Sequence, residues 1–559
     1  MGEKRRMQAI GSMISRLSGR SETVFGWGWE IPALLSVAVA VAGWAIWLQL
    51  RPGVLPAAGP SERVDEAALR SDLETIVGDG TPRVVGTAGA AAGRDRIAGI
   101  LGSLGLAVER QRTRIERRAG AVDVENLVAV VEGSRSDDLR PALAVVAHSD
   151  SVVGSPGASD DGAGVAALCA VARALVARPP VHDVLLLVTD GEERGLLGAQ
   201  AFMAQHPAAS GLRAVLNLDA RGAAGPAAIF ELGPQSSWLA DVIAESVPAP
   251  RTQSLAAAIY ERMPNGTDFT VFLKAGASGF NVAFIGDVAA YHRPEDTVER
   301  QSPWTRAHIA GTALGLVRGL DARWPEGGVI PAGRAVFGDV LGLWVLRWPE
   351  AWTTWIVGIA AMVLGAGSLR ARSRLESPSL VVGVSRSLVA CLFVVVASCA
   401  LGWLAAAGAS AVGIDPVRAP ARAWGISLLG WLSAMLLAFG AGAWLGRRVA
   451  PWDAVVGAWA VWLAPTAAVA WVLPSASMLL VVPLVAAAAA CIAARLLRAK
   501  GAGVVAVAGA GAAVATWIPL EPLVYDALGL SIGAFNGLRA GLVCMLAVPP
   551  VAVAVRRVG

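Results

Sequence analysis

Residues 143–164 read LAVVAHSDSVVGSPGASDDGAG. An apolar run with high β-propensity ends at His148, a loop rich in Ser, Gly and Pro follows, and Asp160 and Asp161 open a stretch of small residues typical of a helix. The pattern predicts a strand that carries an imidazole and several carboxylates to its carboxyl end, the edge at which open α/β sheets gather ligand sites. A histidine and carboxylates in that place indicate a metal site.

The composition divides the chain into two parts. Of its 559 residues, 55% are hydrophobic and 16% are charged, whereas soluble domains average about 25% charged residues. Most acidic residues lie between positions 60 and 325, and the sequence after 350 consists mainly of Ala, Val, Leu, Gly and Trp. This division predicts one globular domain followed by a region that crosses a membrane several times.

Charge and cysteine usage exclude other classes of protein. The net charge is +4, and the sequence contains no basic patch with interleaved aromatic residues, so no nucleic-acid partner is expected. The globular part has a single cysteine, Cys169, which excludes a disulfide within it. A metal site in that part must therefore use histidines and carboxylates.

Apolar segments of about 20 residues are long enough to cross a lipid bilayer, so the sequence predicts an integral membrane protein in contact with lipid. The expected order is a basic cytoplasmic tail at 1–30, a transmembrane anchor at 31–50, a globular domain at 60–325, an interfacial amphipathic segment at 333–350 and a membrane domain at 351–559 with about seven transmembrane helices. We expect these helices near 351–369, 387–408, 424–445, 454–472, 475–494, 502–519 and 529–555. The last segment is interrupted by Asn536 and Arg539, which we expect to snorkel near the end of the span.

The placement of arginines predicts the orientation in the membrane. If the N-terminus is cytoplasmic, the basic loops after each second span also fall inside, and the loops between them carry few basic residues. Eight spans then place both termini in the cytoplasm and the globular domain on the extracytoplasmic side of the cell membrane. The cytoplasmic groups are Arg370, Arg372 and Arg374; Arg447 and Arg448; Arg495, Arg498 and Lys500; and Arg556 and Arg557.

The globular part alternates between strand-like and helix-like segments. This alternation predicts an α/β fold with a mostly parallel central sheet and helices on both faces. Strands are expected at 126–131, 143–147, 184–189, 214–218, 227–232 and 281–285. Helices are expected near 63–78, 90–105, 162–177, 195–206, 235–246, 267–275 and 302–319.

Further polar residues stand where these strands end. Glu192 and Glu193 follow the strand at 184–189, and adjacent carboxylates repel each other unless a cation or a proton is shared between them. Asp219 ends the next strand, and His292 follows the strand at 281–285. Asp268 and Asp296 are weaker candidates for a site role, with structural roles equally open: Asp268 as a cap of the helix after 267 and Asp296 as a residue that orients His292. Tyr291 and Tyr260 could reach an oxyanion, but packing in the core is favoured for both.

These motifs resemble a known family. His148-x-Asp150, the Gly157–Asp161 turn, Glu192-Glu193, Asp219 and His292-x-x-x-Asp296-Thr297 are similar in order and approximate spacing to metallopeptidase family 28, the dizinc aminopeptidase family. The resemblance covers about residues 65–320. The arrangement of one span, the domain and a multispan tail further resembles the endoplasmic-reticulum metallopeptidases and vacuolar membrane proteases. It implies a zinc aminopeptidase-like fold for the domain at 60–325.

The resemblance also implies a ligand set. Asp160 would bridge two zinc ions, His148 and Asp219 would bind one of them, and Glu193 and His292 would bind the other. Glu192 would be the general base, and Asp150 would serve catalysis by orienting His148. The substrates implied are peptides with a free N-terminus. Arg293-Pro294 departs from the family pattern, which bears on the rim of the substrate pocket.

Two other functions remain open from the sequence. Relatives on this scaffold perform glutaminyl cyclisation as zinc acyltransferases with one zinc ion. The domain is alternatively a non-catalytic receptor or scaffold, with the membrane tail as the functional part. Asp161, next to the expected bridging residue, is expected to cap a helix and not to bind metal.

Overall fold

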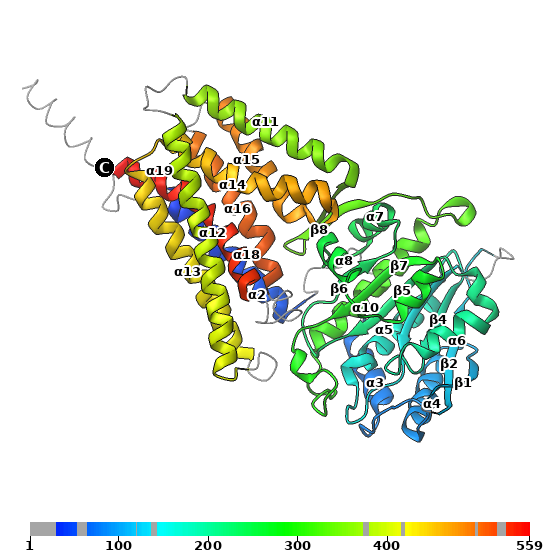
Figure 1. Ribbon diagram of the computed structural model, residues 1–559. Helices are drawn as coiled ribbons and strands as arrows, with labels where there is room; N and C mark the ends of the chain where they lie inside the picture. Colours follow the sequence, from blue (N-terminus) through cyan, green and yellow to red (C-terminus); the bar gives the residue numbers. More distant parts are fainter. Residues whose placement is uncertain are drawn as a thin grey trace, which may run out of the picture.

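The computed structural model describes residues 29–52, 64–118, 120–135, 142–372, 380–414, 420–497, 501–521 and 533–558. Figure 1 shows a bundle of long helices joined to a globular α/β domain. The expected cytoplasmic tail lies almost wholly outside the described residues, as do Arg374, Arg498 and Lys500.

A seven-stranded sheet in the order β1-β2-β4-β3-β5-β7-β6 forms the centre of the globular domain. Its four middle strands β4, β3, β5 and β7 run parallel, whereas β2 pairs antiparallel with β4 and β6 pairs antiparallel with β7. The predicted fold class is therefore confirmed, with antiparallel strands added at the two edges. The strands span Glu109–Ile115 (β1), Val122–Val131 (β2), Leu143–His148 (β3), Val184–Thr189 (β4), Ala214–Ala220 (β5), Ala228–Leu232 (β6) and Ser278–Phe284 (β7).

Helices cover both faces of this sheet because the middle strands are apolar on both sides. Val145 and Leu186 point into one core with α3, α4, α5, α7 and α10, and Val146 and Leu185 point into a second core with Phe202 of α6 and the phenylalanines of α9. The helices span Glu66–Val77 (α3), Ala88–Ser103 (α4), Gly164–Ala177 (α5), Leu197–Gln205 (α6), Ser236–Ser246 (α7), Ser254–Tyr260 (α8), Asp268–Lys274 (α9) and Pro303–Ala322 (α10).

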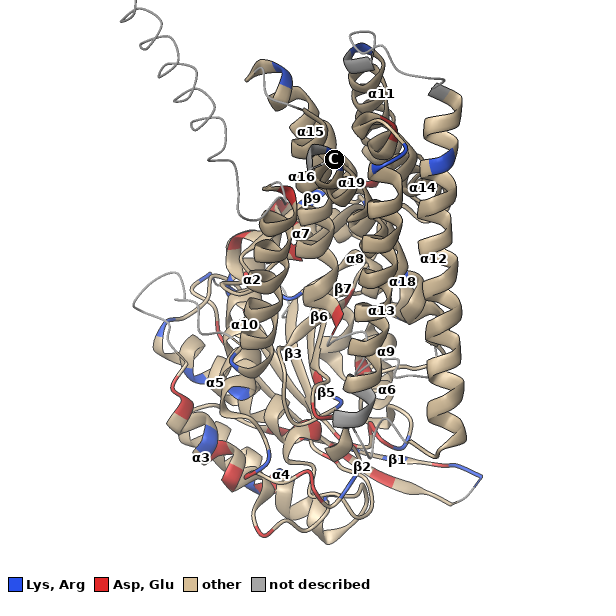
Figure 2. Ribbon diagram, turned by 90° about the vertical axis from the view of Figure 1, so that its left-hand side faces the viewer, with Lys and Arg blue, Asp and Glu red and all other residues tan. Residues whose placement is uncertain are grey.

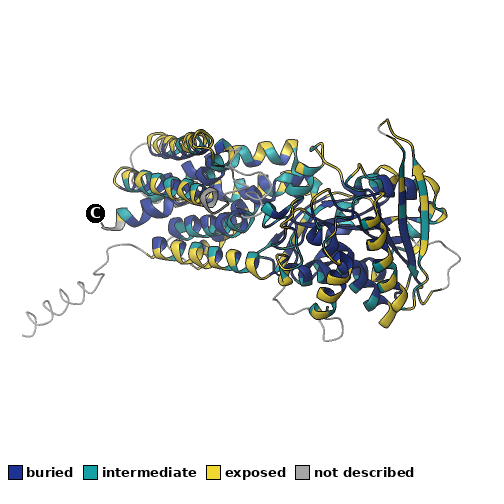
Figure 3. Cartoon of the chain, turned by 90° about the horizontal axis from the view of Figure 1, so that it is seen from below, coloured by how far each residue is buried: buried dark blue, intermediate teal, exposed yellow. Residues whose placement is uncertain are grey.

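Among the described residues, eight helices are long and apolar enough to cross a membrane. One is the expected anchor, and the other seven follow residue 349. Their exposed side chains are largely apolar, and Figure 3 shows exposed residues along the outer faces of the bundle. The helices are α2 (Glu30–Leu50), α11 (Thr353–Arg372), α12 (Leu380–Ala411), α13 (Pro420–Gly446), α14 (Pro451–Val472), α15 (Met478–Leu496), α16 (Gly501–Trp517), and α18 (Gly533–Met545) with α19 (Val548–Val558) as one span.

Arg539 of α18 lies inside the helix bundle, which differs from the prediction. Its side chain is 3% exposed and forms an ion pair of 2.8 Å with Glu521, and a further nitrogen donates to Asn536 Oδ1 over 2.6 Å. Ser427 of α13 donates to the other oxygen of Glu521. The prediction that Arg539 snorkels to the surface is wrong, because a carboxylate distant in the sequence pairs with it inside the bundle.

The segment 333–350 forms a β-hairpin of β8 (Ala335–Val340) and β9 (Trp344–Pro349). Asp339 fixes the hairpin to the globular domain, because its carboxylate accepts a hydrogen bond from Thr252 N and pairs with Arg251. On β9, Trp344 and Leu346 are exposed. An apolar outer edge agrees with the amphipathic character expected from the sequence, and the location of the segment at a membrane surface stays a prediction.

The globular domain and the bundle touch through short polar contacts. Ser254 Oγ at the start of α8 donates to Ser475 O in the turn between α14 and α15, over 2.5 Å. Trp44 Nε1 of α2 donates to Leu341 O at the tip of the hairpin. Figure 2 shows Asp and Glu mostly on the globular domain, where Lys and Arg also occur, and a further group of Lys and Arg at the far end of the bundle. The orientation of these ends relative to the membrane stays a prediction.

Candidate metal centre

The parallel strands bring the predicted ligands to one edge of the sheet. His148 is the last residue of β3, Glu192 and Glu193 follow β4, Asp219 lies near the end of β5, and His292 follows β7. Because β4, β3, β5 and β7 are parallel neighbours, their carboxyl ends meet. Asp160 reaches the same point from the helical turn Ala158–Ala163, which connects the loop after β3 to α5.

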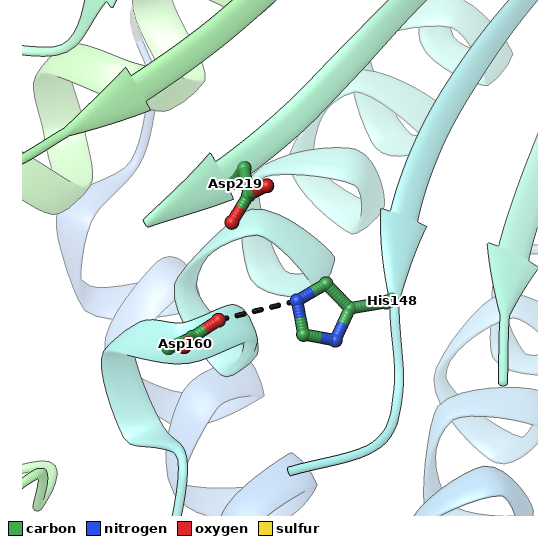
Figure 4. Close-up of side chains that lie close together, drawn as sticks. All are labelled: His148, Asp160 and Asp219. Atoms are coloured by element: carbon green, nitrogen blue, oxygen red, sulfur yellow. Dashed lines mark hydrogen bonds and ion pairs between the residues drawn. The ribbon is translucent and has the colours of Figure 1, made fainter. Parts of the chain in front are cut away.

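Two groups of three side chains could each hold a metal ion. His148, Asp160 and Asp219 place one ligand atom each within 4.8 Å of one another, and so do Asp160, Glu193 and His292. Figure 4 shows the first group, with His148 and Asp219 directed toward Asp160 from neighbouring strands. Asp160 belongs to both groups, as a bridging ligand would.

Each oxygen of Asp160 faces a different histidine. Oδ1 lies 3.1 Å from His148 Nε2, and Oδ2 lies 3.2 Å from His292 Nε2. His292 Nε2 is also 3.0 Å from Glu193 Oε1. The Tyr291 ring stacks on the His292 ring with their centroids 3.8 Å apart. The carboxylate of Asp160 thus joins the two groups into one centre.

Asp150 supports both sides of this centre. Its carboxylate accepts hydrogen bonds from the backbone N–H of Glu192 over 3.0 Å and of Glu193 over 3.2 Å. The Nδ1 atom of His148 lies 3.1 Å from the backbone oxygen of Asp150 and 3.5 Å from its Oδ1. Asp150 therefore lies next to His148 and also holds the turn that carries the two glutamates, while its role in orienting His148 stays a prediction.

Asp296 supports Asp160, which differs from the expected support of His292. Its two carboxylate oxygens accept from Ser159 N over 2.8 Å and from Asp160 N over 3.2 Å. The peptide bond between Asp160 and Asp161 is cis. The Asp161 carboxylate accepts hydrogen bonds from Gly164 N at the start of α5 and from His148 N. Asp161 therefore caps the helix and also fixes the end of β3.

Asp268 lies at the start of α9, and its side chain turns toward the sheet. Oδ2 accepts a hydrogen bond of 2.5 Å from Thr189 Oγ1 at the end of β4, and Oδ1 has no hydrogen-bond partner among the described residues. Tyr260, at the end of α8, packs edge-on against Phe230. Asp268 is thus buried beside the centre, while Tyr260 contributes to packing at its border.

Burial and mutual repulsion act on the carboxylates of the centre. Burial is the largest cause that raises the pKa of Asp219 to about 7, and the charge of Asp160 adds to it. Burial likewise raises the pKa of Glu192 well above its usual range, with contributions from Asp219 and Asp268. Burial would lower the pKa of His148, but Asp150 and Asp160 hold it well above the ordinary value. Bound cations would relieve this excess of buried negative charge.

The sequence did not predict two residues near the centre. Arg83 contacts the loop between His148 and Asp160 through backbone oxygens, and Thr189 donates to Asp268. Neither stands in a motif with recognisable spacing. The Pro82-Arg83 pair lies in the connection between α3 and α4, where a charged residue ordinarily indicates a solvated loop.

Residues 126–317 match the family model described as Peptidase family M28. The globular domain belongs to this family. Endoplasmic reticulum metallopeptidase 1 of Rattus norvegicus is 32% identical over 235 residues, which cover 41% of this chain and 26% of the relative. A vacuolar membrane protease of Eremothecium gossypii is 33% identical over 229 residues, or 40% of this chain and 22% of the relative. The matched region thus spans about a quarter of the curated relatives' length.

Solved structures also resemble the M28 domain. A glutaminyl cyclase of an Acidobacteriales bacterium shares 19% identity and a TM-score of 0.39, covering 48% of this chain and 98% of its own. An aminopeptidase from Aneurinibacillus sp. shares 14% identity and a TM-score of 0.39, covering 48% of this chain and 97% of its own. The family assignment depends on the sequence match and agrees with the resemblance seen in the motifs.

Proposed function

We propose that the chain is a membrane-anchored, zinc-dependent exopeptidase of the aminopeptidase type that binds two zinc ions. One observation carries the proposal: Asp160 offers one oxygen to each of two histidines, His148 and His292, and belongs to both groups of potential ligands. A carboxylate shared between two such groups is the arrangement that a site for two metal ions requires. The M28 family of the domain supports a peptidase.

The donor atoms fit zinc. Zinc accepts imidazole nitrogens and carboxylate oxygens, and these are the atoms that His148, Asp219, Glu193 and His292 present around Asp160. Glu193 Oε1 and His292 Nε2 are buried and lack a conventional hydrogen-bond partner among the described residues, although they lie 3.0 Å apart. When bound, two zinc ions would lower the pKa of an attacking water and polarise the scissile carbonyl.

Glu192 is the residue of the chain that moves the proton. It stands beside the two groups and belongs to neither, and the Asp150 carboxylate fixes its backbone. As general base, the Glu192 carboxylate takes a proton from the attacking water and then donates it to the leaving amine.

The charge of the centre favours a substrate with a free amino terminus. Eight carboxylates surround it, and two divalent ions do not neutralise all of them. The remaining negative charge attracts an ammonium group and repels a carboxyl terminus. The eight are Asp150, Asp160, Asp161, Glu192, Glu193, Asp219, Asp268 and Asp296.

The replacement Glu192→Gln tests the mechanism. We expect it to lower the release of N-terminal residues from peptides about 10²–10⁴-fold, because the amide does not accept the proton. The zinc content should stay at two ions per chain. Glu295→Gln is a matched control, since Glu295 is an exposed carboxylate in the loop that carries His292. Full activity of Glu192→Gln would contradict the proposal.

Zinc stoichiometry and product analysis separate the alternatives. One zinc ion per chain together with cyclisation of N-terminal glutamine would identify a glutaminyl cyclase. A wild-type chain that binds zinc but neither hydrolyses nor cyclises peptides would favour a receptor or scaffold. In that case deletion of the membrane tail, and not Asp160→Ala, should remove the cellular effect.

A further inference from the structure

Arg83 is a fully buried arginine beneath the loop that joins the first metal ligand to the bridging one. It lies between α3 and α4, upstream of the residues that match the M28 model. Its Nε donates to Ser149 O over 2.8 Å, Nη1 to Pro156 O over 2.7 Å and Nη2 to Gly157 O over 2.9 Å. All three nitrogens of the guanidinium thus bind backbone oxygens of one loop.

The positions of these oxygens link Arg83 to the metal ligands. Ser149 lies between His148 and Asp150, and Gly157 directly precedes the turn that holds Asp160. The backbone adds two further bonds, since Arg83 N donates to Ser151 Oγ and Ser151 N donates to Arg83 O. Arg83 therefore ties together the two ends of the loop that separates His148 from Asp160.

Two glycines leave the room that the Arg83 side chain occupies. A Cβ on Gly93 of α4 would stand 2.6 Å from Arg83 Cδ, within the stem of the side chain. A Cβ on Gly157 would stand 3.2 Å from Arg83 Nη2 and 2.5 Å from Asp160 O, and the φ of Gly157 is +63°. A side chain at either position would displace the guanidinium or the loop.

The positive charge of Arg83 lies among several acidic groups of the centre. Burying it opposes its charge, while the charges of Asp150, Asp296 and Asp161 favour it. No ion pair with Arg83 occurs within the part of the chain that the structure describes. The Arg83 guanidinium is close enough to these carboxylates to attract them, but it forms no ion pair with any of them. Their oxygens therefore stay available to bind metal ions and backbone N–H groups.

We propose that Arg83 is a positioning residue of the metal centre, which holds His148 and Asp160 at the separation that two metal ions require. The inference rests on the metal site proposed above. The planar fork of arginine reaches three separate oxygens, whereas the ammonium of lysine is a single point. Charge alone is therefore insufficient at this position.

The variants Arg83→Lys and Arg83→Gln in the full-length protein test this inference. We expect each to weaken zinc binding about 10–100-fold, the loss typical of residues that orient ligands from behind. Zinc affinity is measured per folded molecule by competition with a chelator. The visible absorption spectrum of the cobalt-substituted protein provides a readout of ligand geometry, and we expect it to change in both variants.

Arg306→Lys is the matched control. Arg306 is also buried, but it binds Gln301 and Glu66, away from the loop. We expect Arg306→Lys to lower stability while leaving zinc affinity and the cobalt spectrum unchanged. Gly93→Ala provides a second approach, because it disturbs the Arg83 stem without removing the guanidinium, and it decides the question if the Arg83 variants do not fold.

The outcomes separate this inference from the proposed function. Wild-type zinc affinity and an unchanged cobalt spectrum in Arg83→Lys, or in Gly93→Ala if Arg83 variants do not fold, would overturn the positioning role. If the wild-type protein itself binds no zinc, the proposed function fails first. Weakened zinc binding in the Arg83 variants alone supports the inference.

Discussion

His308 of α10 is a buried histidine that the metal centre does not use. Its Nδ1 accepts a hydrogen bond from Ala227 N, and its Nε2 lies 3.0 Å from Ala249 O, so the ring fits only in its neutral form. Burial is the main cause that lowers its pKa from 6.5 to about 4. Between these values the unfolded chain binds the proton and the folded chain does not.

Folding stability should therefore fall as the pH drops below about 6.5, and His308 should contribute about 3 kcal/mol to this loss by pH 4. Thermal unfolding of the full-length protein between about pH 7 and pH 4 measures this loss. His308→Gln should be less stable at neutral pH but show a flatter dependence on pH. Equal slopes for the two proteins would contradict the assignment.

At the level of single residues, the sequence predicted the candidate ligands and Asp150, and it missed the other residues that support them. His148, Asp160, Glu193, Asp219 and His292 stand in motifs because metal binding demands particular side chains at strand ends, and the structure brings them together. Arg83 acts on backbone oxygens, which every residue possesses, so its partners leave no pattern in the sequence. The contact of Asp296 with Asp160 depends on loop geometry for the same reason.

At the level of elements, α18 packs on α12 through glycines. A Cβ on Gly537 would stand 2.1 Å from Ser398 O, and Gly533 and Gly541 also lie against α12. We expect Gly537→Ala to lower the melting temperature of the purified protein, because the helices must separate. Gly430→Ala in α13 is the control, since nothing lies within 4 Å of its Cβ. Equal melting temperatures for both variants would argue against close packing.

The hairpin of β8 and β9 is expected to touch the lipid surface. Trp344 is 64% exposed on β9, and Trp352 and Trp355 are exposed just beyond it. Exposed tryptophans are typical of the membrane–water interface. Brominated lipids should therefore quench the fluorescence difference between the wild type and Trp344→Ala. A tryptophan that is quenched only by soluble reagents would place the hairpin in water.

Elements with a strong apolar pattern or a clear polar start were predicted closely, whereas β1 and α8 were missed. The strands expected at 184–189 and 214–218 are apolar on both faces, as strands in the middle of a sheet are. The observed strands β4 and β5 lie in the middle of the sheet. β1 was missed because Glu109–Ile115 alternates charged residues at an exposed sheet edge. The seven residues of α8 are too few to show a helical period.

For the whole molecule, the predicted topology places the M28 domain outside the cytoplasm. An impermeant maleimide should label Glu295→Cys in intact cells and should label Arg447→Cys only after the membrane is opened. Both positions are exposed, so accessibility to solvent does not separate them. The native cysteines among the described residues are buried or half-buried, which limits background labelling. The opposite pattern would invert the orientation.

The attachment of the hairpin by Asp339 determines what happens if the peptidase is cut free. The globular domain is joined to a candidate span on each side, α2 before it and α11 after it, so its release requires one cut before α3 and another between α10 and β8. The second cut leaves Arg251 and Thr252 on the released side and their partner Asp339 on the membrane side. The released domain would also lose the Ser475 oxygen that accepts a hydrogen bond from Ser254 at the start of α8. A shed domain would therefore be less stable than the anchored one, and the membrane region would act as part of its scaffold.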